Sequence, residues 1–233
     1  MIDRLSDKYF EKLGKPRPAY AFNIIDYYRF KLAYNFLLPG SVLDVGAYFG
    51  NFLQIVRKNN PTRKIYGTDI NKERVDLCNK NLGENVVRLD FRNGILSSFN
   101  ESSVDNVVCT EVIEHIPNDK LAISELCRVA RKRVIITVPY NEKIINYLCI
   151  HCCKYTPASS HLHSYKLNSF DEIIPIGWVI SKRGTIANII SRILARIFNN
   201  LLMVEISETI FCKIFSKKRC RWVYIIIDSV DKI

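Results

Sequence analysis

One aspartate and two glycines are spaced so that they could hold a positively charged ligand. Asp44 lies in a short apolar run, residues 42–45, and Gly46 and Gly50 follow it in the pattern Asp-x-Gly-x-x-x-Gly. Glycine lets the backbone turn sharply and approach a ligand closely, whereas a carboxylate repels phosphate and attracts an amino or sulfonium group. Dinucleotide sites use Gly-x-Gly-x-x-Gly instead, which leaves a helix N-terminus for a pyrophosphate. The pattern therefore favours a cationic ligand without phosphates.

Further acids follow where the next strands are predicted to end. Asp69 lies 23 positions after Gly46, and an acid at that separation can accept two hydrogen bonds from a ribose diol. Asp90 and Phe91 come at the end of a third run. Each acid alone is equally well explained as a helix N-cap or a turn former. Three acids in register favour a nucleoside ligand.

The strands that must position these residues are predicted from short runs rich in β-branched side chains. Helical spacing resumes after the first run, over residues 51–56. Strands are predicted over residues 42–45, 64–69, 86–91, 104–110, 133–139 and 222–228.

This ordered series resembles the class I, Rossmann-like methyltransferases that use S-adenosylmethionine, in particular the methyltransferase type 11 and ubiquinone-biosynthesis-like group. The resemblance covers roughly residues 35–180 and the last strand. It implies an α/β fold with a doubly wound, mostly parallel seven-stranded sheet, an antiparallel last strand, and a helical insert between strands 6 and 7. It also implies S-adenosylmethionine as cofactor. The cofactor-binding residues it implies are Asp44, Gly46, Ala47, Gly50, Asp69, Ile70, Asp90, Phe91 and Glu111.

One residue of the glycine loop departs from the family pattern. Many relatives carry a third glycine where this chain has Tyr48. A ring at this position would line the acceptor pocket, or cover the methionine end of the cofactor and block the site.

Histidines are the candidates for acid–base chemistry. The sulfonium carries an activated methyl group, so the protein must mainly align the acceptor and exclude water. A base is needed only where the acceptor must lose a proton, and an imidazole titrates near neutral pH. His115 and His163 are the catalytic candidates for an oxygen or nitrogen acceptor.

The sequence also contains a candidate metal site. Glu111, Glu114 and His115 stand at positions i, i+3 and i+4, so they can converge, and His163 would add a later ligand for a divalent ion. The Glu-x-x-Glu-His arrangement is similar to that of ubiquinone-biosynthesis O-methyltransferases and small-RNA 2′-O-methyltransferases, where a divalent ion can orient acceptor hydroxyls. The same letters occur in methyltransferases that need no metal, in which His115 would cap the acceptor site. Both interpretations stay open.

A rival cluster has zinc-like spacing. Cys149 and Cys152 form a Cys-x-x-Cys pair, with His161 and His163 after it. The alternative is that residues 144–148 begin a helix whose apolar face continues through both cysteines as small buried hydrophobes.

Composition predicts one domain in a reducing compartment. A chain of 233 residues, 48% hydrophobic, can build one core. We expect an N-terminal helical segment over residues 1–40 and the methyltransferase domain over 41–233. Eight cysteines without a signal-peptide pattern predict a cytoplasmic protein, peripheral to a membrane as an alternative.

The formal charge of +11 is concentrated on the flanks. Residues 176–233 carry ten Lys/Arg against four Asp/Glu, whereas residues 41–175 carry 17 against 15. The insert, residues 187–218, has apolar residues at helical spacing with basic residues between and after them. It is predicted to pack on the core or on a second copy in a homodimer, or to lie on an anionic membrane surface and give access to a lipid-linked acceptor.

Three functions compete. The first is methyl transfer to an oxygen or nitrogen, with carbon the weaker choice, of a small-molecule, lipid-linked or glycan acceptor. The second is metal-assisted RNA 2′-O-methylation, which is weaker because no nucleic-acid-binding module is evident. The third is a non-enzymatic membrane or assembly protein that retains the fold.

Overall fold

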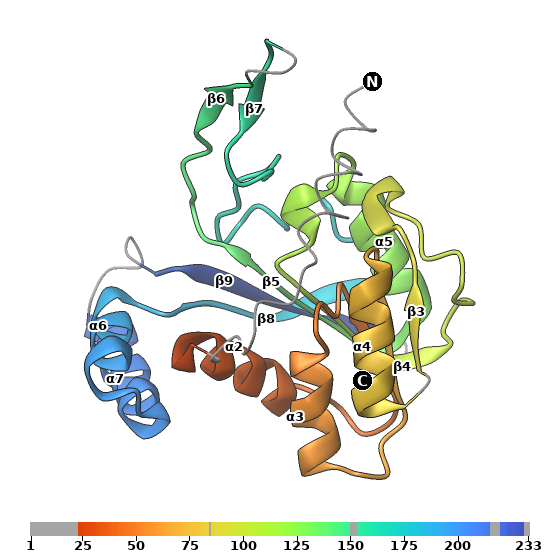
Figure 1. Cartoon of the computed structure of the whole chain (residues 1–233), viewed down its shortest axis with the longest axis horizontal. Coiled ribbons are helices and arrows are strands. Elements are labelled where there is room, and N and C mark those ends of the chain that lie inside the picture. The colour runs from red at the N-terminus through yellow and green to blue at the C-terminus, as the bar shows by residue number, and fades with distance from the viewer. Residues whose placement is uncertain (1–22, 84, 150–152, 215–219, 231–233) are drawn as a thin grey trace.

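Seven strands form one sheet in the order β3-β2-β1-β4-β5-β9-β8 (Figure 1). The computed structural model describes residues 23–83, 85–149, 153–214 and 220–230. Strands β1 to β5 are parallel, and β9 is antiparallel to both β5 and β8. This confirms the predicted doubly wound α/β fold with an antiparallel last strand. The strands are β1 (Val42–Val45), β2 (Ile65–Asp69), β3 (Val86–Arg88), β4 (Val104–Thr110), β5 (Ala130–Pro139), β8 (Trp178–Ile186) and β9 (Trp222–Ser229).

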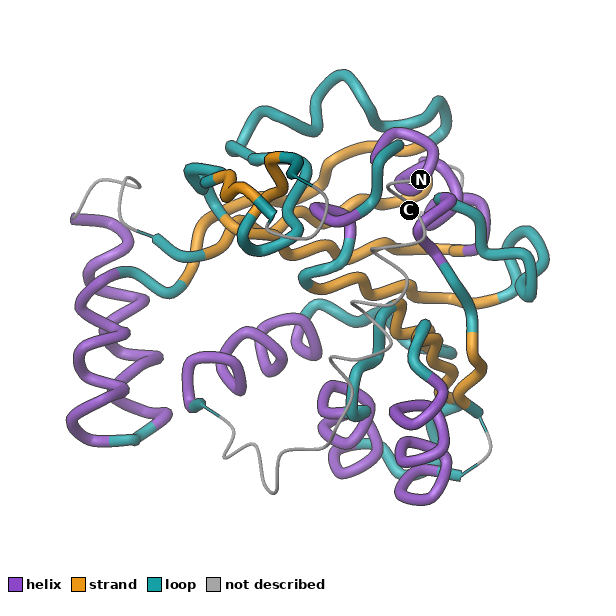
Figure 2. The backbone as a smooth tube through the Cα atoms, turned by 45° about the horizontal axis from the view of Figure 1, so that its top comes forward, coloured by secondary structure: helices purple, strands orange, loops and turns teal. Residues whose placement is uncertain are grey.

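Helices cover both faces of the sheet. Figure 2 shows α2, α3 and α4 together on one face. Buried side chains from all three helices join one hydrophobic cluster with strand residues, whereas Ile25 of α2 belongs to another cluster. Helix α5 packs on the other face in the largest cluster. The insert forms two helices, α6 and α7, between β8 and β9, as predicted. The helices are α2 (Ile24–Asn35), α3 (Asn51–Asn59), α4 (Lys72–Leu82), α5 (Asp119–Val129), α6 (Ile189–Phe198) and α7 (Leu201–Ile214), with 3₁₀ turns η1 (Phe91–Asn93) and η2 (Ile113–His115).

Asparagine caps explain where four of these helices begin. Asn23, Asn71, Asn118 and Asn188 each accept a hydrogen bond from a backbone N–H of the first helical turn. Such caps satisfy N–H groups that have no partner inside the helix. Helix α3 instead begins after Gly50, which has a left-handed φ of 74° and no side-chain cap.

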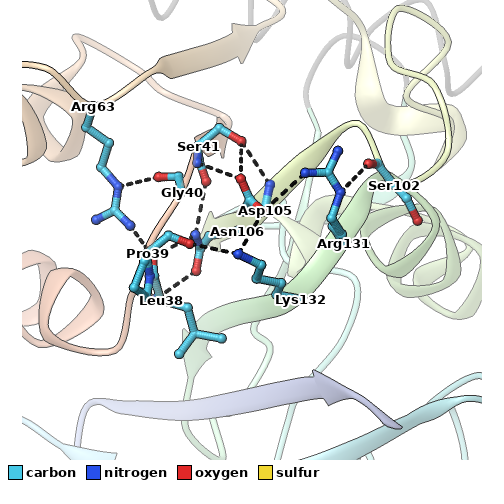
Figure 3. A network of polar contacts seen from close by, with 10 residues as sticks. All are labelled: Leu38, Pro39, Gly40, Ser41, Arg63, Ser102, Asp105, Asn106, Arg131 and Lys132. Atoms are coloured by element: carbon cyan, nitrogen blue, oxygen red, sulfur yellow. Dashed lines mark hydrogen bonds and ion pairs between the residues drawn. The ribbon is translucent and has the colours of Figure 1, made fainter. Parts of the chain in front are cut away.

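A network of polar contacts holds the amino ends of β1 and β4 (Figure 3). Asp105 accepts hydrogen bonds from the N–H and the hydroxyl of Ser41, both at 2.9 Å, and pairs with Lys132 at 3.1 Å. The Asn106 side chain accepts from the Leu38 N–H at 2.8 Å and donates to the Leu38 and Ser41 carbonyls at 3.0 Å. The network fixes β1 against β4 at the end of the sheet opposite the strand-end acids.

The helix predicted over residues 144–148 is wrong. Strands β6 (Asn146–Leu148) and β7 (Tyr155–Pro157) pair there as an antiparallel hairpin that projects from the sheet (Figure 1). The side chains of β6 are exposed, so a helix in this position would have no surface on which to bury its apolar face. The third strand is also shorter than predicted. The boundary predicted at residue 40 stays a prediction, and residues 1–22 lie outside the described residues.

Candidate functional site

A cavity of about 340 Å³ lies at the carboxyl ends of β1, β2 and β4. Strand β1 has β2 on one side and β4 on the other, which is the switch point where doubly wound sheets bind ligands. Its volume falls in the range of roughly 300–1,000 Å³ that small-molecule sites occupy. The structure brings most of the predicted cofactor residues to this cavity, together with His115. They are Asp44, Gly46, Ala47, Asp69, Ile70, Asp90, Phe91 and Glu111.

Two glycines shape the loop after β1 in different ways. Gly46 has a φ of 78°, and an added Cβ would lie 2.4 Å from Cγ2 of Val112, so only glycine fits this turn. At Gly50, an added Cβ would lie 2.8 Å from Cδ1 of Leu82 and 3.2 Å from Sγ of Cys78. Gly50 therefore lets α3 approach α4, and it does not line the cavity.

Asp44 is a buried carboxylate at the base of the cavity. Its side chain is almost fully buried, and Oδ1 has no hydrogen-bond partner among the described residues. Burial, and next the charge of Asp69, raise its pKa to about 7. A carboxylate in this position is stabilised by a cation more than by any neutral group.

Asp69 is held in a fixed orientation. Its Oδ2 accepts from the N–H of Tyr48 and its Oδ1 from the N–H of Asn71, both at 2.9 Å, and Nη1 of Arg74 lies 3.6 Å from Oδ1. Burial raises the pKa of Asp69, and these hydrogen bonds and Arg74 oppose the rise. Each carboxylate oxygen has a second lone pair with which to accept from a diol.

Tyr48 lines the cavity wall. It has a left-handed φ of 54°, which costs a residue with a side chain about 1 kcal/mol. The guanidinium of Arg74 lies 4.3 Å from the centre of its ring, and the Phe49 ring packs edge-on at 4.2 Å. Arg74 thus links the Tyr48 ring to Asp69, a role that the sequence did not reveal.

The third strand ends in a salt-bridged acid and a buried aromatic ring. Asp90 pairs with Arg92, whose Nε lies 2.8 Å from Oδ1. Phe91 is buried in the cluster on the α5 face, yet part of it borders the cavity. A ligand that bonds to Asp90 must share the carboxylate with Arg92.

A buried arginine from α2 completes the cavity on the side of β5 and β9. Arg29 is 7% exposed, with Nη1 at 3.6 Å from Oε1 of Glu111 and 3.5 Å from the hydroxyl of Thr137. Its guanidinium lies 4.7 Å from the centre of the Trp222 ring. Burial raises the pKa of Glu111, and the charge of Arg29 lowers it. Sequence reasoning missed Arg29, whose only signal is a charge among the apolar residues of α2.

His115 stands at the cavity wall as a neutral imidazole. Its Nδ1 lies 3.1 Å from the carbonyl oxygen of Ser160, which can only accept, so Nδ1 carries the proton. Burial lowers the pKa of His115 to about 4. The ring of His161 meets it edge-on at 4.7 Å, and Nδ1 of His161 pairs with Glu142.

Behind this pair lies a buried carboxyl group. Glu114 is fully buried, and neither carboxylate oxygen has a hydrogen-bond partner in any other described residue. Burial, and next Glu111, raise its pKa well above its ordinary value. One potential ligand atom each from Glu114, His115 and His161 lie within 4.8 Å of one another. This set has the donor chemistry that Zn²⁺ or Mn²⁺ accepts.

The structure groups His161, rather than the predicted His163, with His115. The N–H of Leu162 donates to the carbonyl of Glu114 at 2.7 Å, which sets His161 beside Glu114. His163 then lies farther along the turn, with Nε2 at 2.8 Å from the carbonyl of Ile116. The Cys-x-x-Cys candidate cannot be placed, because residues 150–152 lie outside the described residues.

Comparisons with known proteins agree with this geometry. The family model described as "Methyltransferase domain" matches residues 43–138, from β1 to β5. The fold is similar to that of an S-adenosylmethionine-dependent methyltransferase from Archaeoglobus fulgidus, with a TM-score of 0.62 and 19% identity over 98% of this chain and 100% of that one. It is also similar to magnesium protoporphyrin IX methyltransferase from Synechocystis, with a TM-score of 0.56 and 14% identity over 97% and 96% of the two chains. No curated protein sequence matches the chain significantly.

The match and the fold agree with the class that the sequence predicted. Residues 43–138 match a methyltransferase domain, and the fold is similar to that of S-adenosylmethionine-dependent methyltransferases.

Proposed function

We propose that this protein transfers the methyl group of S-adenosylmethionine to an oxygen or nitrogen atom of a small-molecule, lipid-linked or glycan acceptor. One observation carries the proposal: the strand-end acids and a neutral histidine border the same cavity. The cofactor supplies a methyl group that is already activated, so the protein has to bind, orient and exclude water.

The acids divide the work of binding. Asp44 would balance the positive charge of the cofactor, and Asp69 would accept hydrogen bonds from both hydroxyls of its ribose. Ile70 and Phe91 would pack against the adenine ring, and Asp90 would accept from its amino group. All five residues border the cavity, which supports this proposal.

His115 is the candidate base. With the proton fixed on Nδ1 by Ser160, Nε2 carries the lone pair that can accept a proton from an acceptor hydroxyl or amine. His163 is removed from this position by its contact with Ile116, so we assign it no role in proton transfer.

Calorimetric titration with S-adenosylhomocysteine tests the binding half of the proposal. Asp69→Ala should weaken binding at least tenfold, because it removes both ribose hydrogen bonds. Asp76→Ala is the matched control, since this exposed aspartate of α4 pairs only with Lys72 among the described residues. Absence of binding to the wild type would sink the proposal.

A methyl-transfer assay tests the chemistry. The protein is incubated with S-adenosylmethionine labelled in the methyl group and with separate pools of phenols, alcohols, amines, glycans and lipid extracts. His115→Ala should lower transfer to the best acceptor by roughly 10²–10⁴-fold while leaving cofactor affinity within about threefold. Equal transfer by wild type and variant would remove His115 from the mechanism.

A divalent ion is a second candidate, favoured by the buried carboxyl of Glu114, whose oxygens have no hydrogen-bond partner in the described part of the chain. Glu114, His115 and His161 would hold the ion, and Glu142 would orient His161 from behind. Bound there, the ion would lower the pKa of an acceptor hydroxyl, including a ribose 2′-hydroxyl of RNA. Elemental analysis of protein treated with chelator and reloaded with Zn²⁺ or Mn²⁺ should find about one ion per chain, lost in Glu114→Ala. Metal content equal in wild type and variant would exclude this site.

A further inference from the structure

We propose that the helical hairpin formed by α6 and α7 docks on an anionic lipid surface. The inference stands apart from the chemistry of the cavity, because it depends on which side chains the two helices turn outward. Its first support is an inverted arrangement of polar and apolar residues.

The inner faces of the hairpin carry small and polar groups. Ser191 and Ala195 are the buried residues of α6. The hydroxyls of Ser191 and Ser207 lie 2.7 Å apart, and Glu208 Oε1 accepts from the N–H and the side-chain amide of Asn188, both at 2.9 Å. Buried hydrogen bonds thus help to hold the two helices together, beside the apolar contacts of Ala195 and Val204 in the cluster around Trp222.

The outer faces carry the large apolar side chains. On α6, Ile189, Ile193 and Ile197 recur every fourth residue and are 37%, 49% and 65% exposed. This stripe points away from the buried residues of the same helix. Helix α7 repeats the pattern with Leu202, Ile206 and Ile210, and Phe198 and Met203 flank the turn. A soluble helix normally buries this face.

The turn of the hairpin is the most exposed part of this surface. Figure 2 shows it at the end of the hairpin remote from the sheet. Ile197, Phe198 and Leu202 are each more than half exposed, with only two asparagines and Leu201 among them. No helix in the described residues is long and apolar enough to cross a bilayer. The geometry therefore suits insertion into the interface rather than a span.

Charge selects lipid over a second copy of the chain. In the described part of the hairpin, the two acids are already engaged: Glu205 pairs with Lys31 at 2.6 Å, and Glu208 is buried. Arg196 is exposed, and four of the residues from 213 to 219 are basic in the sequence. Two such faces brought together would present like charges to each other, whereas an anionic bilayer would attract the arginines of α6.

Vesicle flotation with the full chain tests the inference. Wild-type protein should float with vesicles of phosphatidylcholine and phosphatidylglycerol at least tenfold more than with phosphatidylcholine alone, and the difference should shrink as salt rises. The double variant Ile197→Ser, Leu202→Ser should lose at least tenfold in flotation. Ile95→Ser, Ile176→Ser is the matched control, because both isoleucines are exposed outside the hairpin, and it should float as wild type.

Two further measurements control for the folding of each variant and for its oligomeric state. Circular dichroism and titration with S-adenosylhomocysteine show that each variant is folded and report separately on the proposed cofactor site. Light scattering after gel filtration gives the oligomeric state. Equal flotation of wild type and hairpin variant would overturn the proposal, as would a wild-type dimer that ignores vesicles and dissociates in the hairpin variant.

Discussion

Burial raises the pKa of Asp44 to about 7, so we expect cofactor binding to depend on pH. Its pKa of about 7 in the unliganded protein means that a cation binds best once the carboxyl is ionised. The affinity for S-adenosylmethionine should therefore fall as the pH drops below 7, by up to about tenfold per pH unit. Titrations of wild type and Asp44→Asn from pH 5.5 to 8 separate this effect from the ligand's own titration, because the latter affects both proteins. Parallel profiles would contradict the assignment.

Tyr48 borders the cavity, and we predict that its ring lines the site without closing it. Its backbone N–H donates a hydrogen bond to Asp69, which glycine would also do, and its ring contacts the guanidinium of Arg74. We expect Tyr48→Gly to leave the affinity for S-adenosylhomocysteine within about threefold, since loss of the ring and relief of the left-handed strain act in opposite directions. The value of kcat/KM for the acceptor should fall, because the ring forms part of the wall. A tenfold gain in cofactor affinity would show instead that the ring blocks the site.

At the scale of elements, the sequence was sufficient to place a residue at the cavity where that placement depends only on the residue's own strand. Asp44 lies in one run and Glu111 follows another, and the strand character of both runs is local, so their meeting at one edge was predictable. The place of Arg29 was not predictable, because Glu111, Thr137 and Trp222 are distant in sequence and only packing brings α2 over them. His161 and His163 are indistinguishable by spacing, and the hydrogen bond of the intervening residue decides which one faces His115. The β6–β7 hairpin was missed because its apolar residues are exposed.

Substitution of Asn106 tests how β1 is held against β4. The residue is fully buried, and its truncation would leave the backbone N–H and C=O of Leu38 and the C=O of Ser41 without this partner. Asn106→Ala should lower the free energy of unfolding by about 2–4 kcal/mol. Urea denaturation measures it. Exposed Asn59 of α3 is the control, and its alanine variant should lose less than about 1 kcal/mol.

Cofactor affinity of folded Asn106→Ala should equal that of the wild type, because the network lies at the opposite end of the strands. A loss of stability below about 0.5 kcal/mol would mean that the loop before β1 holds its place without this side chain.

For the whole molecule, charge and shape divide the chain into two surfaces. Residues 41–175, which form most of the cavity, are nearly balanced in charge, whereas residues 176–233 carry the basic excess and the apolar hairpin. Helix α2 joins the two, since Lys31 bonds to Glu205 of α7 and Arg29 reaches Glu111 at the cavity. If the protein docks on a surface through the hairpin, helix α2 would therefore connect the docked hairpin to the cavity.

This arrangement predicts that sheet, α2 and hairpin unfold as one unit. Strand β9 contributes buried residues to all three hydrophobic clusters. Its odd- and even-numbered side chains lie on opposite faces of the sheet, and Trp222 belongs to the cluster under the hairpin. Far-ultraviolet circular dichroism and tryptophan fluorescence should therefore report one coincident thermal transition. A helical signal that melts ahead of tryptophan fluorescence would show that the hairpin unfolds separately. S-adenosylhomocysteine at a hundred times its Kd should raise that single Tm by about 5–10 °C, because mass action adds about 2.7 kcal/mol to the folded state.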